Sequence, residues 1–229
     1  MAVKPWLLVV MLTCATGISA QESDESDPFE ESWGHLEKGK SGFQETWVHP
    51  EADFSKYDSL YLWSAEFQYR DVGPAQRTQS TMMNTRQREF GISDEDRELF
   101  EDAVADAFVK EIQKAKNFRV SAELGPNTLI MRGAVLDVVS LVPPRTAGRT
   151  DVYLASFGEA TLVLELIDAD DGEVVAVVAE RRQIRSGSGR IDQYSSPANR
   201  ATVIGEVRRW AARAARKLRG ELDKAIAKR

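Results

Sequence analysis

The stretch EATLVLELI, residues 159–167, decides the fold because its side chains alternate in polarity with a period of two. One side of an extended chain here carries Ala160, Leu162, Leu164 and Leu166. The opposite side carries Glu159, Thr161, Val163 and Glu165. Antiparallel strands that lie between a core and solvent show this alternation. We therefore predict a half-buried strand over about residues 152–167.

The residues that follow, DADDGE at 168–173, allow two readings. Three carboxylates in four positions suggest calcium, but an EF-hand loop requires Gly at its sixth position and an acid at its twelfth. Glu173 and Ala179 occupy those positions, so the calcium motif fails. Gly172 instead suits a left-handed turn position between two apolar runs. We predict a hairpin turn that leads into a strand over residues 173–184.

Further strands are expected outside this hairpin. Residues 128–142 form an apolar run that ends at Pro143-Pro144, and residues 59–69 form a run rich in aromatic side chains. A short strand at residues 118–122 fits between them. The register of the 128–142 run stays open, because charged side chains fall on both of its faces.

Two amphipathic helices complete the pattern. Ser93 begins the first as a capping residue, and its apolar stripe recurs every four residues at Phe100, Val104, Phe108 and Ile112. Ser196-Pro197 is expected to begin the second, with Ser as the cap and Pro at the first helical position. The apolar stripe of the second helix comprises Val203, Val207, Trp210, Ala211, Ala214, Leu218, Leu222 and Ile226.

The order of these elements predicts an α+β fold, because strands and helices do not alternate strictly. We expect a single domain over residues 46–229, with an antiparallel sheet of about four to five strands and two helices packed on one face. Residues 71–91 form a long polar connection, either a functional flap or a surface excursion. Residues 21–45 are acidic and aperiodic, which predicts a flexible tether. Trp33 and Phe43 within it are either stray aromatics or side chains that dock on the domain.

The N-terminus is typical of an export signal. Lys4 precedes a short apolar run from Trp6 to Leu12, which is too short for a bilayer span of about 20 residues. Cleavage after Ala20 would remove residues 1–20 as a signal peptide. The alternative is lipidation of Cys14, the only cysteine, although the residues before it fit a lipoprotein motif poorly. We expect the protein in the periplasm, or on the inner face of the outer membrane if Cys14 carries lipid.

Charge is distributed unevenly along the chain, whose net charge is -6. Residues 198–229 carry ten Lys and Arg against three acids, and many of these cations share one side of the second helix. This surface could contact anionic lipid headgroups, at about 1 kcal/mol for each cation near an anionic surface. The alternative is a solvated helix face whose apolar stripe packs on the sheet. The candidate contacts are Arg208, Arg209, Arg213, Arg216 and Lys217.

Side chains for metal binding or catalysis are sparse. His35 and His49 are the only histidines, which leaves no zinc ligand set and little material for a Ser-His-Asp triad. Three carboxylates on predicted strands could form an acid–base pair for hydrolysis: Asp137, Glu159 and Glu165. Three arginines on the same strands favour cross-strand ion pairs instead: Arg132, Arg181 and Arg182. We expect no metal, no cofactor and no enzymatic activity.

Residues from about 48 to 185 resemble the bacterial envelope family catalogued as domain of unknown function 3313. The resemblance rests on HPEADFSKYD at 49–58, on GPNTL at 125–129 and on the hairpin at 168–173. Members are described mostly as lipoproteins of Gram-negative bacteria with no assigned activity. The resemblance therefore implies export and an α+β domain, and it carries no catalytic residues over. The motif around Cys14 departs from the family's lipoprotein pattern.

Together these observations predict a non-enzymatic exported envelope protein that binds another envelope component. That component is either an envelope protein or anionic lipid headgroups, and export makes nucleic acid an unexpected partner. An alternative is a periplasmic carrier of a lipid or small apolar ligand, which requires an apolar pocket between helices and sheet. A third hypothesis is a hydrolase that uses a carboxylate pair.

Overall fold

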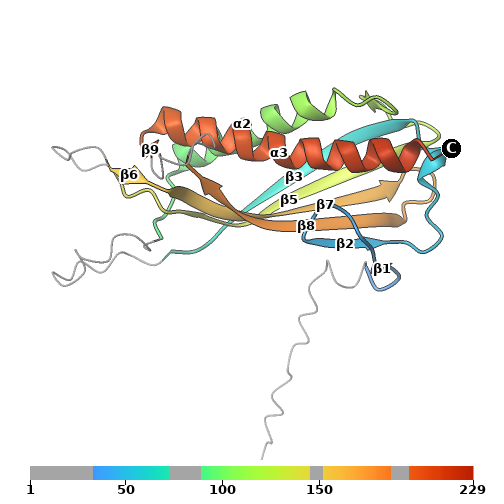
Figure 1. The fold of residues 1–229 in the computed structure, drawn as a ribbon, viewed down its shortest axis with the longest axis horizontal. Coiled ribbons are helices and arrows are strands. Elements are labelled where there is room, and N and C mark those ends of the chain that lie inside the picture. Colours follow the sequence, from blue (N-terminus) through green and yellow to red (C-terminus); the bar gives the residue numbers. More distant parts are fainter. Residues whose placement is uncertain (1–32, 73–88, 145–151, 187–195, 229) are drawn as a thin grey trace, which may run out of the picture.

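The computed structural model describes residues 33–72, 89–144, 152–186 and 196–228. Its helical elements are the short 3-10 turn η1 (Phe54–Lys56) and the helices α2 (Asp94–Ile112) and α3 (Arg200–Ile226). Figure 1 shows both helices on one face of a long, twisted sheet. The order of strands in this sheet is β1 (Glu37–Lys38), β2 (Glu45–Val48), β8 (Val174–Arg185), β7 (Ser156–Asp168), β5 (Thr128–Ser140), β3 (Ser59–Tyr69) and β4 (Arg119–Ser121).

The α+β class is confirmed, but the sheet has seven strands and is mixed, whereas four to five antiparallel strands were expected. β5, β7 and β8 are antiparallel neighbours, as the hairpin pattern predicts. β3 instead runs parallel to β4 on one side and to β5 on the other. The cause is α2, which connects β3 to β4. A helical crossover returns the chain to the end of the sheet where it began, so the next strand runs parallel to the first. Local alternation does not encode that direction.

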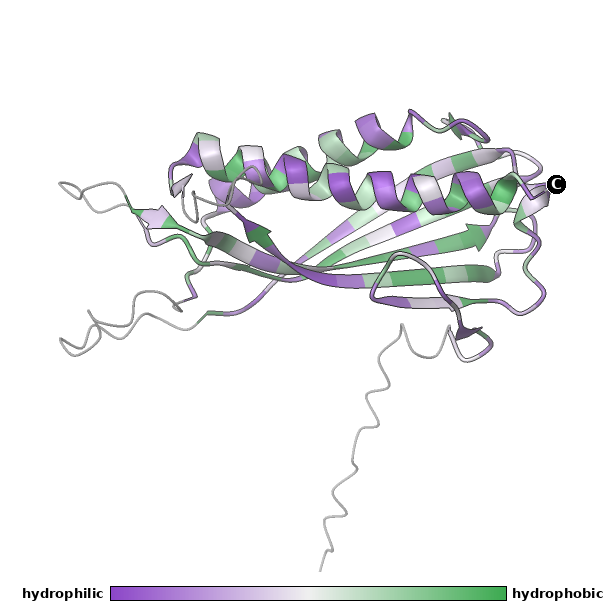
Figure 2. Ribbon diagram, in the orientation of Figure 1, coloured by the Kyte–Doolittle hydropathy of each residue, from purple (hydrophilic) through white to green (hydrophobic). Residues whose placement is uncertain are grey.

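Both ends of the sheet leave part of a long strand uncovered. β2 pairs with Ala176–Ala179 of β8 only, and β4 pairs with Ser59–Tyr61 of β3 only. Within the described ranges, the remainder of β3 therefore has β5 as its single strand neighbour. Figure 2 shows that the first half of β8 is hydrophobic and that its middle is hydrophilic.

The main core lies between the helices and the sheet. The face of β7 that alternation marked as apolar is buried there, through Ala160, Leu162, Leu164 and Leu166. The helix stripes meet it with Phe100, Val104, Phe108, Trp210, Leu218 and Leu222. Each buried side chain of this size contributes about 1.5–3 kcal/mol, so this packing sets the position of both helices.

Residues 33–48, here named the N-terminal strap, include the edge strands β1 and β2 and place aromatic side chains on the sheet. Trp33 stacks on Trp47 with ring centroids 5.9 Å apart, and Phe43 is buried in the main core. Beneath the two indoles lies a second apolar cluster that includes Ile130, Ala134, Val163, Ile167, Val174 and Val177. The part of the expected tether from residue 33 onward is therefore packed on the domain. Residues 1–32, which include the expected signal peptide and Cys14, are outside the described ranges.

The predicted start of α2 agrees with the structure, whereas that of α3 does not. The predicted cap of α2 is confirmed, because Ser93 Oγ accepts a hydrogen bond from the amide of Asp96 at 3.2 Å. The predicted start of α3 is wrong by three residues, since Asn199 is its cap and accepts from the amide of Thr202 at 2.9 Å. Residues Ser196–Pro197 form β9, which pairs with β6 (Tyr153–Leu154). No helix in the described ranges is long and apolar enough to cross a bilayer.

A bulge settles the register of β5. Asp137 has a φ of 55°, and the pairing with β7 shifts between Leu136 and Val139. At the other end of β7 the expected hairpin turn is confirmed, with Gly172 at a φ of 78°. Of the expected 71–91 connection, residues 73–88 are outside the described ranges.

Candidate functional site

The predicted basic face of α3 is divided by ion pairs. Three of its five cations each contact a buried carboxylate. Arg209 Nε lies 2.9 Å from Glu206 Oε2. Arg216 Nε lies 3.1 Å from Glu111 Oε1 on α2, and Lys217 Nζ lies 2.9 Å from Glu180 Oε2 on β8. These three side chains therefore neutralise buried acids and tie α3 to its neighbours.

Arg213 and Arg208 are exposed and have no ion pair with another described residue. Partial burial of the Arg213 guanidinium lowers its pKa, although the residue as a whole is exposed. Glu206 partly opposes that shift, and nearby guanidiniums, including Arg182, lower the pKa further. Arg208 lies about 140° around the helix from Arg213, given about 100° for each residue. The five predicted contacts thus do not form one free cationic patch.

The strand carboxylates are held in ion pairs between strands, which confirms the cross-strand reading for Arg132 and Arg181. Arg182 is the exception, because it pairs with Glu180 of its own strand. Arg70 binds Asp137 through two nitrogens, at 2.6 and 2.5 Å. Arg181 contacts Asp137 at 2.9 Å and Glu159 at 2.6 Å. The hydrogen bond from Arg70 holds the pKa of Asp137 below its usual value despite partial burial. A carboxylate in this state is a poor proton donor at neutral pH.

The two histidines, 14 residues apart in sequence, lie close together where the start of the strap meets the residue that follows it. Their ring centroids are 5.5 Å apart, and His49 Nε2 is 3.5 Å from Glu173 Oε1. His35 Nε2 is 2.9 Å from the carbonyl oxygen of Val174. In the part of the chain that the structure describes, no group of three or more His, Cys, Asp or Glu side chains is placed to hold a metal ion.

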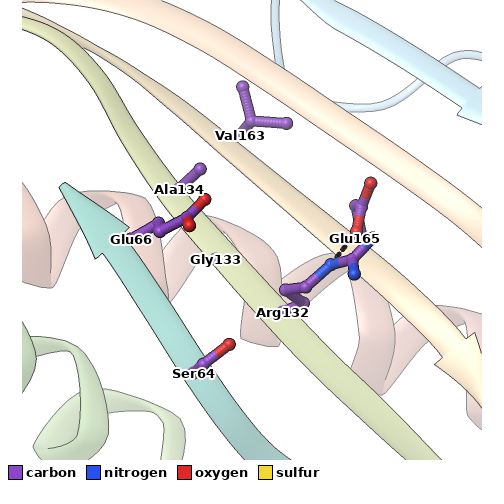
Figure 3. Close-up of a pocket in the computed structure, with 7 residues that line it drawn as sticks. All are labelled: Ser64, Glu66, Arg132, Gly133, Ala134, Val163 and Glu165. Atoms are coloured by element: carbon purple, nitrogen blue, oxygen red, sulfur yellow. Dashed lines mark hydrogen bonds and ion pairs between the residues drawn. The ribbon is translucent and has the colours of Figure 1, made fainter. Parts of the chain in front are cut away.

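A cavity of about 350 Å³, lined by both charged and apolar residues, opens on the sheet face away from the helices, beside the strap. Figure 3 shows Glu66 on β3 and the paired Arg132 and Glu165 on β5 and β7 around it. Glu165 is 2 % exposed and also accepts a hydrogen bond from Trp33 Nε1 at 2.9 Å. The lining comprises Ser64, Glu66, Arg132, Gly133, Ala134, Val163 and Glu165. We name it the outer cavity.

An apolar groove of about 200 Å³ lies between α2 and the sheet. Trp63, at 61 % exposure one of three exposed large hydrophobic side chains in the described ranges, is part of its wall. Its other walls include Leu62, Phe67, Val104, Phe108, Met131 and Val135. We name it the α2–β3 groove.

The outer cavity and the α2–β3 groove lie on the two faces of one stretch of sheet. Ser64, Gly133 and Ala134 line both of them. The stretch includes the part of β3 that β4 leaves uncovered. Register shifts at Leu62/Ser64 and Phe67/Tyr69 bound a regular run of four residues, Ser64–Phe67. This run, with a hollow on each face, is the candidate site.

The helix side of this site has an acidic rim. Ala105 and Val109 line the groove, and Glu98 and Asp102 continue the same stripe of α2 at spacings of four and three residues. Both acids are without an ion pair to any other described residue. The one sequence signal for this site was Trp63 in the aromatic-rich 59–69 run, but only the structure shows that this side chain is exposed.

Comparison with solved structures gives matches at low sequence identity and with TM-scores below 0.5. A PelC dodecamer from Paraburkholderia phytofirmans is 11% identical, with 80% of this chain and 95% of that chain covered and a TM-score of 0.33. A DUF330 family protein from Xanthomonas campestris is 12% identical, with coverages of 77% and 93% and a TM-score of 0.34. A "putative lipoprotein" from Caulobacter crescentus is 17% identical, with coverages of 61% and 89% and a TM-score of 0.30.

No curated protein matches the chain. A family model does match, over residues 27–214, and its description is "Protein of unknown function (DUF3313)". The match spans α2, most of α3 and every strand of the main sheet, including the candidate site. It also extends well beyond the 48–185 stretch on which the resemblance rested. The chain therefore belongs to the DUF3313 family.

Proposed function

We propose that this chain is an exported, non-enzymatic protein of the bacterial envelope that binds a partner protein along the open edge of β3. The observation that carries the proposal is the pair of hollows on the two faces of Ser64–Phe67, one apolar and one with charged side chains in its lining. Its export is supported by the signal-like residues 1–20, and its lack of catalysis by the ion pairs that hold Asp137, Glu159 and Glu165.

An uncovered strand edge is a template for an extended peptide. Main-chain hydrogen bonds provide affinity, and alternate side chains of the added strand enter sites on opposite faces of the sheet. At β3 the two faces of the sheet offer different environments. The side chains on each side of the added strand would therefore contribute to specificity. An apolar side chain in the α2–β3 groove would contribute about 1.5–3 kcal/mol. Each new ladder hydrogen bond would add about 0.5–1.5 kcal/mol net.

These contributions set the expected strength of binding. A run of four residues permits only a short ladder, and association itself costs at least about 4 kcal/mol. We therefore expect a dissociation constant in the micromolar range or weaker for the segment alone. Contacts of the partner with the exposed Trp63 indole would increase the affinity.

Site-specific photocrosslinking in intact cells tests this proposal. A photoreactive phenylalanine analogue at Trp63 is expected to give a discrete protein adduct. The matched control is Tyr153, which is equally exposed at 61% but belongs to the separate β6–β9 pair. Gly133→Leu, which fills the α2–β3 groove, should abolish the Trp63 adduct. Identical adducts at both positions, or an adduct indifferent to Gly133→Leu, would contradict the proposal.

The proposed location has its own test. Mass spectrometry of the mature protein from cell envelopes should show either Gln21 as the free N-terminus or a lipid on Cys14. The first outcome supports a soluble periplasmic protein, and the second supports a tether to the outer membrane. An intact Met1 in a cytoplasmic fraction would overturn export.

A carrier of an apolar ligand is the second candidate, because the α2–β3 groove is the kind of pocket between helix and sheet that this function requires. Its volume of about 200 Å³ is below the roughly 300–1,000 Å³ of typical ligand pockets, which favours one side chain over a whole lipid. Lipid that copurifies with the wild-type chain and is lost in Gly133→Leu would support the carrier. Contact of α3 with anionic headgroups has less support, because three of its five cations are already paired with buried acids.

A further inference from the structure

We infer that the strand added at β3 carries a lysine or arginine opposite Glu66 and an apolar side chain at the neighbouring position. This inference rests on the proposed function and specifies the chemistry of the partner at that site. It follows from three features of the open edge: the charge of Glu66, the apolar groove on the opposite face, and the acidic rim of α2.

Glu66 is the charged side chain of the run Ser64–Phe67. It pairs across the ladder with Ala134 of β5, lines the outer cavity, and is exposed. Figure 3 shows the neighbouring cation, Arg132, joined to Glu165 instead. Among the described residues Glu66 has no ion-pair partner, so its carboxylate is available to a side chain from an added strand.

The position of Glu66 makes it selective. Residues directly opposite one another in adjacent strands interact through their side chains, and like charges there oppose pairing. Charges and bulges on an edge strand commonly prevent indiscriminate strand addition. β3 has both, since Glu66 lies between two register shifts. A partner strand must therefore carry a positive charge opposite Glu66. Acidic segments are repelled at that position.

The face of the sheet toward α2 favours an apolar side chain on the added strand. Residues adjacent to the one opposite Glu66 point toward α2, because side chains alternate across a strand. They meet the α2–β3 groove, whose walls include Phe67, Val104 and Phe108. Beyond the groove, Glu98 and Asp102 add negative potential on the helix side. An alternating sequence of apolar and cationic residues satisfies both faces.

Three capped eight-residue peptides test the inference, with valine alternating with lysine, serine or glutamate. Binding to the chain purified from cell envelopes is measured by isothermal titration calorimetry. We expect the lysine peptide to bind about five- to thirtyfold more tightly than the glutamate peptide, with serine between them. Glu66→Lys should reverse that order.

Two controls separate a specific contact from general attraction to an acidic protein. Glu51→Lys makes the same charge change at an exposed acid in the turn after β2, so it should leave the order of the peptides unchanged. A lysine peptide with a central proline cannot complete the ladder and should bind at least tenfold more weakly.

The outcomes distinguish this inference from the proposed function. Equal binding of all three peptides, or no binding by any of them, overturns the charge specificity. An equal effect of Glu51→Lys and Glu66→Lys overturns it as well. In each case, a Trp63 photoadduct that Gly133→Leu abolishes would still support a partner at β3. If the wild-type chain gives no Trp63 photoadduct and the peptides also show no charge preference, both the proposed function and this inference are overturned.

Discussion

At the scale of the residue, buried carboxylates connect distant parts of this molecule. Asp168, at 1% exposure, accepts hydrogen bonds from Lys56 Nζ at 2.5 Å, Tyr57 hydroxyl at 2.8 Å and the amide of Asp170 at 2.9 Å. Burial alone would raise the pKa of Asp168, but these three donors outweigh it and lower the pKa. The hairpin turn and η1 are thereby joined through one side chain.

Asp168→Asn is expected to reduce the free energy of unfolding by about 1–3 kcal/mol at pH 7, because a buried charge-assisted hydrogen bond is weakened. Since the folded pKa is lowered, the wild-type contribution is full above about pH 4 and is lost as the pH falls through the folded value. Urea denaturation at pH 7 and pH 3 should therefore show a smaller difference at pH 3. Asp170→Asn, an exposed control, should show little effect at either pH.

Two arginines on α3 provide a second contrast. Arg209→Met should destabilise the fold by about 1–3 kcal/mol, because Glu206 is 2% exposed and loses the charged hydrogen bond from Arg209. Arg213→Met should change stability by no more than about 0.5 kcal/mol. Chemical denaturation of both variants checks this pair. Equal losses would contradict the division of the basic face into paired and unpaired cations.

At the scale of the element, the long strands depend on irregularities at defined positions. β5 and β7 pair through a bulge at Asp137, and the backbone of Gly158 lies close to β5 there. A Cβ atom at Gly158 would be 2.3 Å from the carbonyl oxygen of Val139. At Gly133 the nearest atom to such a Cβ is Leu164 Cδ2, at an ordinary 3.5 Å.

Alanine at these two glycines should therefore have opposite consequences. Gly158→Ala should cost about 1–3 kcal/mol or more, because backbone atoms must move. Gly133→Ala should be neutral or stabilising by up to about 1 kcal/mol, since it restricts the unfolded chain without a clash. Thermal unfolding followed by circular dichroism compares them directly. A large loss for Gly133→Ala would also disqualify Gly133→Leu as a groove-filling variant.

At the scale of the whole molecule, the sheet is covered differently on its two faces. Both helices cover one face, and the N-terminal strap covers part of the other. Trp33 and Trp47 shield the second apolar cluster, and the indole of Trp33 also donates to the buried Glu165. The open stretch of β3 remains beside this cover.

Two tryptophans test this arrangement. Trp33→Ala should lower the free energy of unfolding by about 2–3 kcal/mol, because it uncovers apolar surface and removes a donor from Glu165. Trp63→Ala should change stability by no more than about 0.5 kcal/mol, because its side chain is 61% exposed. Guanidinium denaturation measures both. A comparable loss for Trp63→Ala would mean that this indole serves the fold rather than a partner.

How much could be predicted depended on the range of the interaction. Ser93 was found because a helix cap acts across three residues, and the turn at Gly172 because a left-handed position favours glycine. The predicted helix start at Ser196-Pro197 was wrong because the local cap pattern was present, but these residues pair with β6 instead. The candidate site was missed because the open edge of β3 results from the short length of β4, its neighbour in the sheet.

The sequence by itself determined the α+β class, the approximate bounds of the long strands β3, β5, β7 and β8, the start of α2 and the turn at 168–173, because side-chain periodicity and turn chemistry are local. Only the tertiary structure decided the parallel pairing of β3, the position of the strap and the ion pairs that divide α3. These depend on contacts between residues far apart in the chain, such as Glu180 with Lys217 and Trp33 with Glu165. A local sequence pattern does not indicate which distant side chain will pair with a buried charge. It also does not indicate which part of a strand edge will lack a neighbouring strand.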